Sequence, residues 1–379
     1  MNFEFTEEQE MIRQAARDYA QRELLQDVLE REEKAEFPTR HVKNMAELGF
    51  LGMMVPPEYD GGGMDSVSYV LAMEEIAKVD ASAAVIMSVN NSLVCYGLNR
   101  FGNEEQKQKY LKPLARGEVI GAFLLSEPEA GSDATHQHTS AEDKGDFYLI
   151  NGTKNWITNA NSASTYIVIA QTHPEKKHRG INAFIVDKNT PGITLGPHEK
   201  KMGMNSSDTH SVMFQDVKVP KENRIGEDGF GFKFAMMVLE AGRIGIASQA
   251  LGLASGALER ATAYAKERKA FGTEIANHQA IAFKLSDMAV KIENARNLCI
   301  KAAWLKDNHK PITVASAMAK QYAADIAMEV TTEAVQIHGG YGYVKEYHVE
   351  RLMREAKLTQ IYEGTSEVQK IIISRSLLK

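Results

Sequence analysis

The spacing of apolar and polar residues changes character twice along this chain of 379 residues. The stretch 1–117 is predicted to be helical: Thr6 can cap a first helix with Gln9 at the capping-box position, and Pro38 suits the first turn of another. Within 118–225, short β-rich runs alternate with turn residues, a pattern typical of an antiparallel barrel or sandwich. Helical spacing returns in 226–379.

The third stretch predicts long helices packed side by side. Residues 230–271 contain no proline, and a helix of about 38 residues there would be roughly 57 Å long. Further helices are expected over 278–307, 311–337 and 366–378, with Ser366 and Gln369 as a capping box at the start of the last. The predicted fold class is α+β and mostly helical: an N-terminal helical domain (1–117), a middle β domain (118–225) and a C-terminal four-helix bundle (226–379).

Composition and charge narrow the class of protein. Charged residues make up 25% and apolar residues 44% of the chain, as in a soluble globular protein of two or three domains. A net charge of −6 argues against binding nucleic acid or an anionic membrane surface. The two cysteines, Cys95 and Cys299, lack metal-ligand spacing, so no metal site is expected. Without an apolar run of about 18 residues, and with an acidic N-terminus unlike a targeting peptide, the expectation is a cytoplasmic protein with no membrane span.

Because common nucleotide-binding and hydrolase motifs are missing, the candidate chemistry rests on four other stretches. The loop "LLSEPEAGSDAT" contains small residues and hydroxyls that can cradle a phosphate. Its composition alone favours an ordinary turn, and the negative charges of Glu127, Glu129 and Asp133 weigh against an anion site. "NGTKNWITNA" places Trp beside Thr, either as core packing or against a planar ligand. "RKAFG" and "QIHGGYGYVKE" end helices with a cation or with paired glycines, which also let a ligand approach the backbone.

Together with "FTEEQEMIR" and "YEGTSEVQ", these stretches resemble the acyl-CoA dehydrogenase family, in the same order and over essentially the whole chain. "IMSVNNSL", "GRIGIASQALG" and "QIYEGTSEVQ" resemble its short-chain, butyryl-CoA-type members most. The resemblance implies the three domains predicted above, with FAD bound between the last two and completed by a neighbouring subunit. It also implies a homotetramer that converts a short acyl-CoA to the trans-2-enoyl-CoA and passes electrons to electron-transferring flavoprotein.

By position, the resemblance assigns the residues of the site. Those expected to contact FAD from the β domain are Phe123, Leu125, Ser126, Gly131, Ser132, Trp156, Ile157 and Thr158, with Thr158 the donor to the reactive flavin nitrogen. Those expected to reach FAD from the partner subunit are Arg268, Phe271, Gln279, Gln336, Gly339 and Gly340, while Thr365 and Glu367 contact it just after the base. Those expected to contact the substrate are Ser132, Glu240, Arg243, Tyr362 and Gly364.

The reaction takes a proton from the α-carbon and a hydride from the β-carbon, so it needs a carboxylate held dry beside an electron sink. The resemblance implies that Glu363 is this base and that its own N–H is one donor to the thioester oxygen, which gains negative charge. The local sequence fits this role, because Glu363 lies just before a predicted helix N-terminus and Gly364 allows a tight bend.

Two residues depart from the family pattern, and several alternative functions stay open. Glu240 stands where short-chain members often have Asp, and Glu129 adds an acid to the flavin loop, which affects the expected CoA contacts and not the chemistry. The alternatives are a medium- or branched-chain dehydrogenase, an acyl-CoA oxidase or flavin monooxygenase, and an inactive helical scaffold. A decarboxylating glutaryl-CoA-type enzyme is disfavoured, since "SAAVIMSVNNSLVCYG", the expected pocket helix, contains no Arg or Lys.

Overall fold

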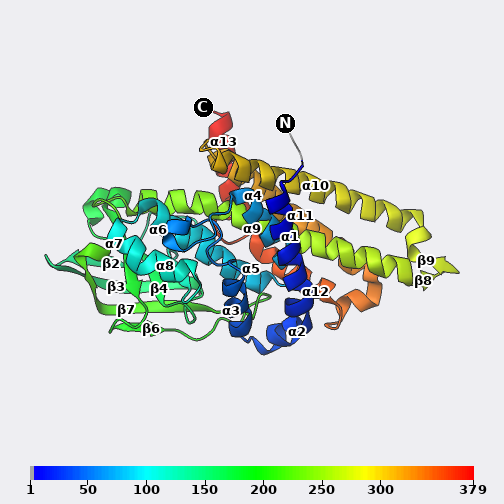
Figure 1. Ribbon diagram of the computed structural model, residues 1–379, viewed down its shortest axis with the longest axis horizontal. Coiled ribbons are helices and arrows are strands. Elements are labelled where there is room, and N and C mark those ends of the chain that lie inside the picture. Colours follow the sequence, from blue (N-terminus) through cyan, green and yellow to red (C-terminus); the bar gives the residue numbers. More distant parts are fainter. Residues whose placement is uncertain (1–3) are drawn as a thin grey trace.

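The structure, a computed structural model, describes residues 4–379 and has the helix–strand–helix order that the sequence predicts (Figure 1). The first helix is capped as predicted: Thr6 Oγ1 accepts from Gln9 N (3.2 Å) and Gln9 Oε1 accepts from Thr6 N (3.0 Å). The N-terminal helices are α1 (Glu7–Tyr19), α2 (Leu25–Lys34), α3 (Thr39–Glu47), α4 (Ser66–Ala77), α5 (Ala81–Ser88), α6 (Tyr96–Phe101), α7 (Glu104–Gln106) and α8 (Lys112–Ala115).

Two buried helical stretches form the centre of this N-terminal part. Helix α4 is buried along its whole length, and its Glu74 accepts from Arg296 on α10 (2.7 Å) and from Ser255 on α9 (2.8 Å). Helices α5 and α6 are joined by the π-helical segment Val89–Cys95 into one stretch, Ala81–Phe101. By length and composition this stretch could cross a membrane, but 94% of its most apolar window is buried inside the protein, as in a core helix.

The middle part is one curled sheet. Its strands are β1 (Gly121–Leu124), β2 (Ser140–Asp143), β3 (Phe147–Thr158), β4 (Thr165–Gln171), β5 (Ile181–Asp187), β6 (Ile193–Leu195) and β7 (Thr209–Pro220). They pair in the order β1-β4-β2-β3-β7-β6, with β5 on β4. Most pairs are antiparallel as predicted, but β1 runs parallel to β4, because the long loop after β1 lets the chain cross over before it pairs again.

The C-terminal part returns to helices. Its elements are α9 (Gly231–Glu267), β8 (Lys269–Ala270), β9 (Thr273–Glu274), α10 (Gln279–Asp307), α11 (Thr313–His338), α12 (His348–Thr359) and α13 (Ser366–Leu377). At 37 residues, α9 matches the predicted long helix, and Figure 1 shows it running from the β domain to the opposite end of the molecule. Helix α12 was not predicted from the sequence: it has only 12 residues, and its apolar stripe of Val349, Leu352 and Ala356 is mixed with the buried ion pair of Arg351 and Glu355 (2.7 Å).

Candidate active site

The turn that carries Glu363 joins α12 to α13 and has a strained backbone. Glu363 has a φ of 50° and Gly364 a φ of 93°, so two successive residues adopt left-handed conformations. Gly364 O accepts from Lys320 Nζ (2.7 Å) and from Gln369 Nε2 (2.8 Å). Both donor side chains are fully buried, and together they hold the turn in this conformation.

Helix α13 begins at Ser366 as predicted, but the expected capping box of Ser366 and Gln369 was wrong. Thr365 is the N-cap, and its Oγ1 accepts from Val368 N (3.2 Å). Ser366 Oγ instead donates to Asp325 Oδ1 on α11 (3.0 Å). Ser366 is thus held by α11, whereas Gln369 Nε2 donates to Gly364 O within the turn, so neither side chain completes the local motif.

The carboxylate of Glu363 lies against α9 in a buried position. Its Oε2 is buried and has no hydrogen-bond partner within residues 4–379. A Cβ at Gly242 would overlap this oxygen and would lie 2.7 Å from Leu93 Cδ2, so only glycine leaves room for the carboxylate. Burial raises the pKa of Glu363 to about 7, against the lowering effect of the Lys320 and Arg243 cations. Such a carboxylate is suited to accept a proton near neutral pH.

The predicted substrate residues on α9, Glu240 and Arg243, lie on either side of Gly242. Glu240 is half-buried and accepts from Thr313 Oγ1 (2.8 Å), whereas every residue from Ala241 to Ala250 is buried. Arg243 is only 6% exposed, and its Nε and Nη1 have no partner within the described chain. Burial lowers the pKa of Arg243, against Glu240 and Glu363, which raise it. Buried N–H groups without partners are costly, so Arg243 is placed to donate to a ligand.

Side-chain hydrogen bonds tie Tyr362, the residue before Glu363, to α9 and α5. Tyr362 donates its hydroxyl to Gln249 Oε1, and Gln249 Nε2 donates to Ala81 O at the start of α5 (2.7 Å). One turn earlier on α9, a Cβ at Gly245 would lie 2.7 Å from the hydroxyl of Tyr69. No sequence pattern marks Lys320, Gln249 or Tyr69 as part of the site. Only the packing of the helices shows that these side chains face the turn that carries Glu363.

The loop after β1 is anchored by a buried ion pair. Glu127 and Lys154 lie 2.7 Å apart, Lys154 Nζ also donates to Leu125 O (3.0 Å), and Glu127 accepts from two backbone N–H groups, of His138 (2.6 Å) and Thr139 (3.0 Å). Burial lowers the pKa of Lys154 to about 8, against the pairing with Glu127, which raises it. Glu127 therefore points into the protein and does not oppose an anion at the loop's surface.

The other acids of this loop are engaged locally. Asp133 accepts from Thr135 Oγ1 (2.7 Å) and contacts His136 (2.6 Å), and the exposed Glu129 lies 3.5 Å from His138. Gly131 and Ser132 are exposed at the tip, and a Cβ at Gly131 would meet nothing within 4 Å. The tip is thus open to a ligand, as a phosphate-binding loop requires.

Trp156 occupies a β-bulge, where β3 gains one residue against β7 between Lys154 and Ile157. Its φ of 60° is unusual for a residue with a side chain, and its indole is 61% exposed. Ile157 beside it is buried, Thr158 is half-buried, and Asn155 N donates to Ser126 O of the loop (2.9 Å). The bulge therefore turns a large aromatic ring outward beside the loop, an arrangement that fits a planar ligand.

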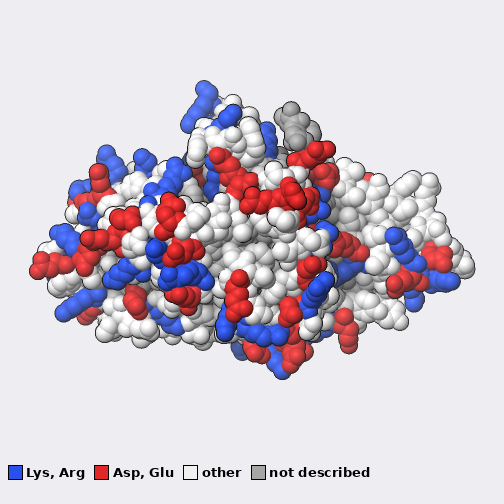
Figure 2. All heavy atoms as spheres, viewed as in Figure 1, with Lys and Arg blue, Asp and Glu red and all other residues white. Residues whose placement is uncertain are grey.

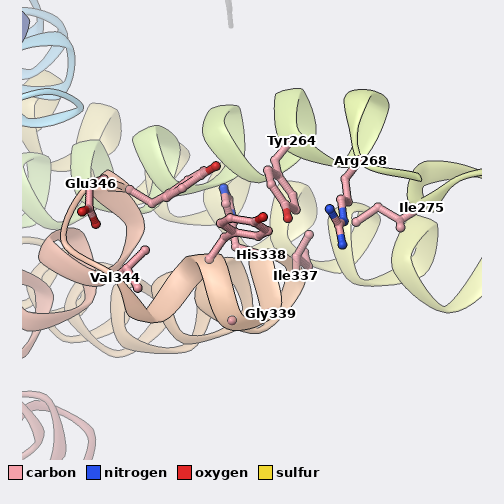
Figure 3. Close-up of a pocket in the computed structure, with 11 residues that line it drawn as sticks. Tyr264, Arg268, Ile275, Ile337, His338, Gly339, Val344 and Glu346 are labelled. Carbon is pink, nitrogen blue, oxygen red and sulfur yellow. The ribbon is translucent and has the colours of Figure 1, made fainter. Parts of the chain in front are cut away.

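The remaining predicted cofactor residues lie at the far end of α9. Arg268, Phe271, Gln279, Gln336, Gly339 and Gly340 are exposed around a cavity of about 680 Å³ or beside it. Figure 3 shows Arg268, Gly339 and the stacked rings of Tyr264 and His338 (4.3 Å) in its lining. In Figure 1 this end, near β8 and β9, lies opposite the β domain, so one chain does not bring the two predicted halves of the FAD site together.

The other predicted residues lie next to Glu363 in the sequence or at the β-domain end of α9. Thr365 and Glu367 follow Glu363 directly, Tyr362 and Gly364 flank it, and Phe123 of β1 stacks on Phe234 of α9 (6.3 Å). Within residues 4–379, no group of three or more His, Cys, Asp or Glu side chains could hold a metal ion.

All three parts of the chain match models of one family. The N-terminal, middle and C-terminal domains of acyl-CoA dehydrogenase match residues 6–118, 122–217 and 229–378. The chain belongs to the acyl-CoA dehydrogenase family and is an oxidoreductase of that class.

Its relatives include short-chain enzymes. It is 49% identical to the short-chain specific acyl-CoA dehydrogenase of Clostridium acetobutylicum, over 100% of both chains. It is 50% identical to subunit CarC of the caffeyl-CoA reductase–Etf complex of Acetobacterium woodii, over 99% of both chains. The solved structure of butyryl-CoA dehydrogenase from Megasphaera elsdenii superimposes with a TM-score of 0.99, at 48% identity and full coverage of both chains.

Proposed function

We propose that this enzyme desaturates short-chain acyl-CoA thioesters, butyryl-CoA-like in size, to the trans-2-enoyl-CoA, with Glu363 as the base. The observation that carries the proposal is the Glu363 carboxylate, whose buried Oε2 has no hydrogen-bond partner among residues 4–379 and lies over Gly242. A carboxylate in that state can take the α-proton, and the Glu363 N–H is then one donor to the thioester oxygen. Arg243, with its free N–H groups, binds the CoA part at the entrance.

The residues around the site fit FAD. The exposed Trp156 ring, the half-buried Thr158 and the open loop tip at Gly131 and Ser132 would hold the flavin and its pyrophosphate. When bound, FAD accepts the hydride from the β-carbon. The adenine end of FAD would contact the residues around Arg268 and Gly339. These residues lie at the opposite end of the chain from the β domain, so a neighbouring subunit would supply them.

An exposed apolar surface supports this assembly of subunits, which we take to be a homotetramer. Phe271 is 98% exposed, and Phe283 and Val290 on α10 are 58% and 59% exposed. Figure 2 shows few charged side chains over the β8–β9 half of α10. A large uncharged surface of this kind marks a contact with another chain. The electron acceptor is proposed to be electron-transferring flavoprotein, since the relative CarC is named as a subunit of an Etf complex. The location is proposed to be the cytoplasm.

The short-chain preference is proposed from the short-chain relatives and from the polar groups that lie beyond the base along α9. The proposed entrance is near Glu240 and Arg243, and the bond between Tyr362 and Gln249 lies at the other end. Gln249 lies seven residues beyond Gly242, or about 10 Å along α9. We propose that the acyl chain extends from the base toward Gln249, whose bond to Tyr362 would limit its length.

Replacing Gln249 by Ala should therefore lengthen the pocket. We expect the ratio of kcat/KM for hexanoyl-CoA to that for butyryl-CoA to rise by about tenfold, because each added methylene then has room to be buried. The matched control is Gln14→Ala, which removes the same side chain from the exposed surface of α1 and should leave the ratio unchanged. An unchanged ratio for Gln249→Ala would show that other residues set the depth.

Anaerobic titration tests the proposed function directly. The holoenzyme is mixed with acyl-CoAs of increasing chain length, and bleaching of the flavin absorbance is followed for each. We expect fast bleaching with butyryl-CoA and about tenfold slower bleaching for each two added carbons. A preference for medium or long chains would contradict the short-chain assignment, and fast peroxide formation in air would indicate an oxidase.

A second candidate is the same chemistry run in the reducing direction, favoured by the likeness to the caffeyl-CoA reductase subunit. Caffeyl-CoA carries an aromatic acyl group, whereas the substrate proposed here is a short aliphatic acyl-CoA. If the reduced enzyme reduces crotonyl-CoA but not an aromatic enoyl-CoA, this result would support a preference for short acyl chains in both the oxidising and the reducing direction.

A further inference from the structure

We propose that Lys320 is a positioning residue for Glu363: it fixes the turn that carries the carboxylate and supplies the cation that favours its ionised form. This inference rests on the proposed role of Glu363 as the base. Lys320 has no exposed surface, so it acts through the turn and its charge and not by contact with the substrate.

The contacts of α11 hold the turn at two points. Lys320 Nζ donates to the carbonyl oxygen of Gly364, the residue directly after the base (2.7 Å). Five residues further on α11, Asp325 Oδ1 accepts from Gln360 Nε2 before the turn (2.8 Å) and from Ser366 Oγ after it (3.0 Å). The left-handed backbone of Glu363 persists because α11 holds the chain on both sides.

The charges around the turn give Lys320 its second role. Two cations, Lys320 and Arg243, favour the ionised form of Glu363. Burial raises the pKa values of the Tyr362 and Tyr69 phenols, and the charge of Glu363 adds to this rise. The groups that act on Lys320 are Glu363, Asp325, Arg243 and Glu367. Burial lowers the pKa of Lys320 to about 8, against Glu363 and Asp325, which raise it. The ammonium group therefore keeps most of its charge near pH 7, where Glu363 loses its proton.

The cation is not required for packing at this position. Gly364 O keeps Gln369 Nε2 as a donor when Lys320 is removed (2.8 Å). An apolar side chain of similar length can fill the buried space, and a buried charge that is replaced in this way often costs no stability. The presence of an ammonium group at this point thus points to its effect on the carboxylate.

The test is the pH dependence of kcat/KM for butyryl-CoA in the holoenzymes of wild type and Lys320→Met. In the wild type, kcat/KM should rise with pH through about 7. Loss of the cation should move this rise upward by about one pH unit, giving about tenfold lower activity at pH 6 and convergence with the wild type near pH 9. Lys320→Arg, which keeps the charge, should restore the wild-type profile, and KM at pH 9 should not change.

Controls separate the electrostatic role from a structural one. Ser366→Ala loosens the same turn without changing a charge, so it should lower the rate equally at every pH. The same uniform loss in Lys320→Met, with the profile unmoved, would overturn the inference. If the Met variant does not fold, Lys320→Gln serves in its place.

An infrared titration gives a readout that needs no turnover. The band of the protonated carboxyl that disappears in Glu363→Gln should titrate at higher pH in Lys320→Met than in the wild type. A midpoint at the same pH would refute the role of Lys320. If the wild type oxidises no acyl-CoA, the proposed function fails, while the infrared midpoint still decides the effect of Lys320 on Glu363.

Discussion

Glu363→Gln should bind FAD normally and lose about 10⁴-fold in the rate of butyryl-CoA oxidation, because the amide keeps the shape of the side chain but cannot accept the α-proton. The measurement is single-turnover bleaching of the flavin under anaerobic conditions, with cofactor content determined from the absorbance of the purified protein. Glu363→Asp, which keeps a carboxylate but withdraws it by one methylene, should retain a measurable rate. Activity near that of the wild type in Glu363→Gln would remove Glu363 from the mechanism.

The same variant should show that the base is held at a cost to stability. The pKa of Glu363 is raised in the folded protein to about 7, so its contribution is most favourable below the unfolded pKa and is lost as pH rises through about 7. Glu363→Gln should therefore unfold at a higher temperature than the wild type at pH 8, with a smaller difference at pH 5. A lower melting temperature at pH 8 would instead mean that the substitution damages the fold.

Gly242→Ala should lower kcat by about 100-fold while leaving the cofactor bound. The added methyl group would overlap Glu363 Oε2 and lie 2.7 Å from Leu93 Cδ2, so the carboxylate must move, and a displacement of about 1 Å at a reacting group costs roughly this factor. Steady-state kinetics with butyryl-CoA measure the effect. The infrared band of the Glu363 carboxyl should also shift, because its surroundings change.

Gly252→Ala is the matched control for this substitution. It lies on the same helix, and its added Cβ would be 2.5 Å from Glu74 O and 2.6 Å from Ala77 Cβ, far from the base. We expect it to lower the melting temperature and to leave kcat per folded molecule close to that of the wild type. Equal losses of kcat in both variants would mean that general loosening of α9, and not the position of Glu363, explains the effect.

The element types and their order follow from the sequence because long helical spacing and short β-rich runs are strong local signals. The long helix α9 and the helix starts at Glu7 and Ser366 agree with the prediction. Helix α12 was not predicted because it has only 12 residues and the buried ion pair of Arg351 and Glu355 interrupts its apolar stripe. The short strands β2 and β6 are polar or only three residues long, and they exist through pairing with neighbours.

The site depends more heavily on tertiary structure than the fold does. Glu363 and Arg243 were assigned by family resemblance, and the structure adds a physical reason for each, in an unpartnered carboxylate oxygen and in unpartnered N–H groups. Lys320 and Gln249 have no local signal, because a lysine or glutamine within a helix acquires its role only from what packs against it. The outward turn of Trp156 likewise comes from a bulge that is defined by pairing with β7.

The burial of α4 has a consequence for how the enzyme folds and is maintained in the cell. Its Glu74 is bonded to Ser255 of α9 and Arg296 of α10, and one hydrophobic core contains Val70 and Leu71 of α4 together with residues of the C-terminal helices. The N-terminal helices and the bundle therefore lose their cores together, and they constitute one cooperative unit despite their separation in sequence. Substitutions at this junction would reduce the abundance of the enzyme, through proteolysis of the unfolded chain, and not the turnover of each surviving molecule.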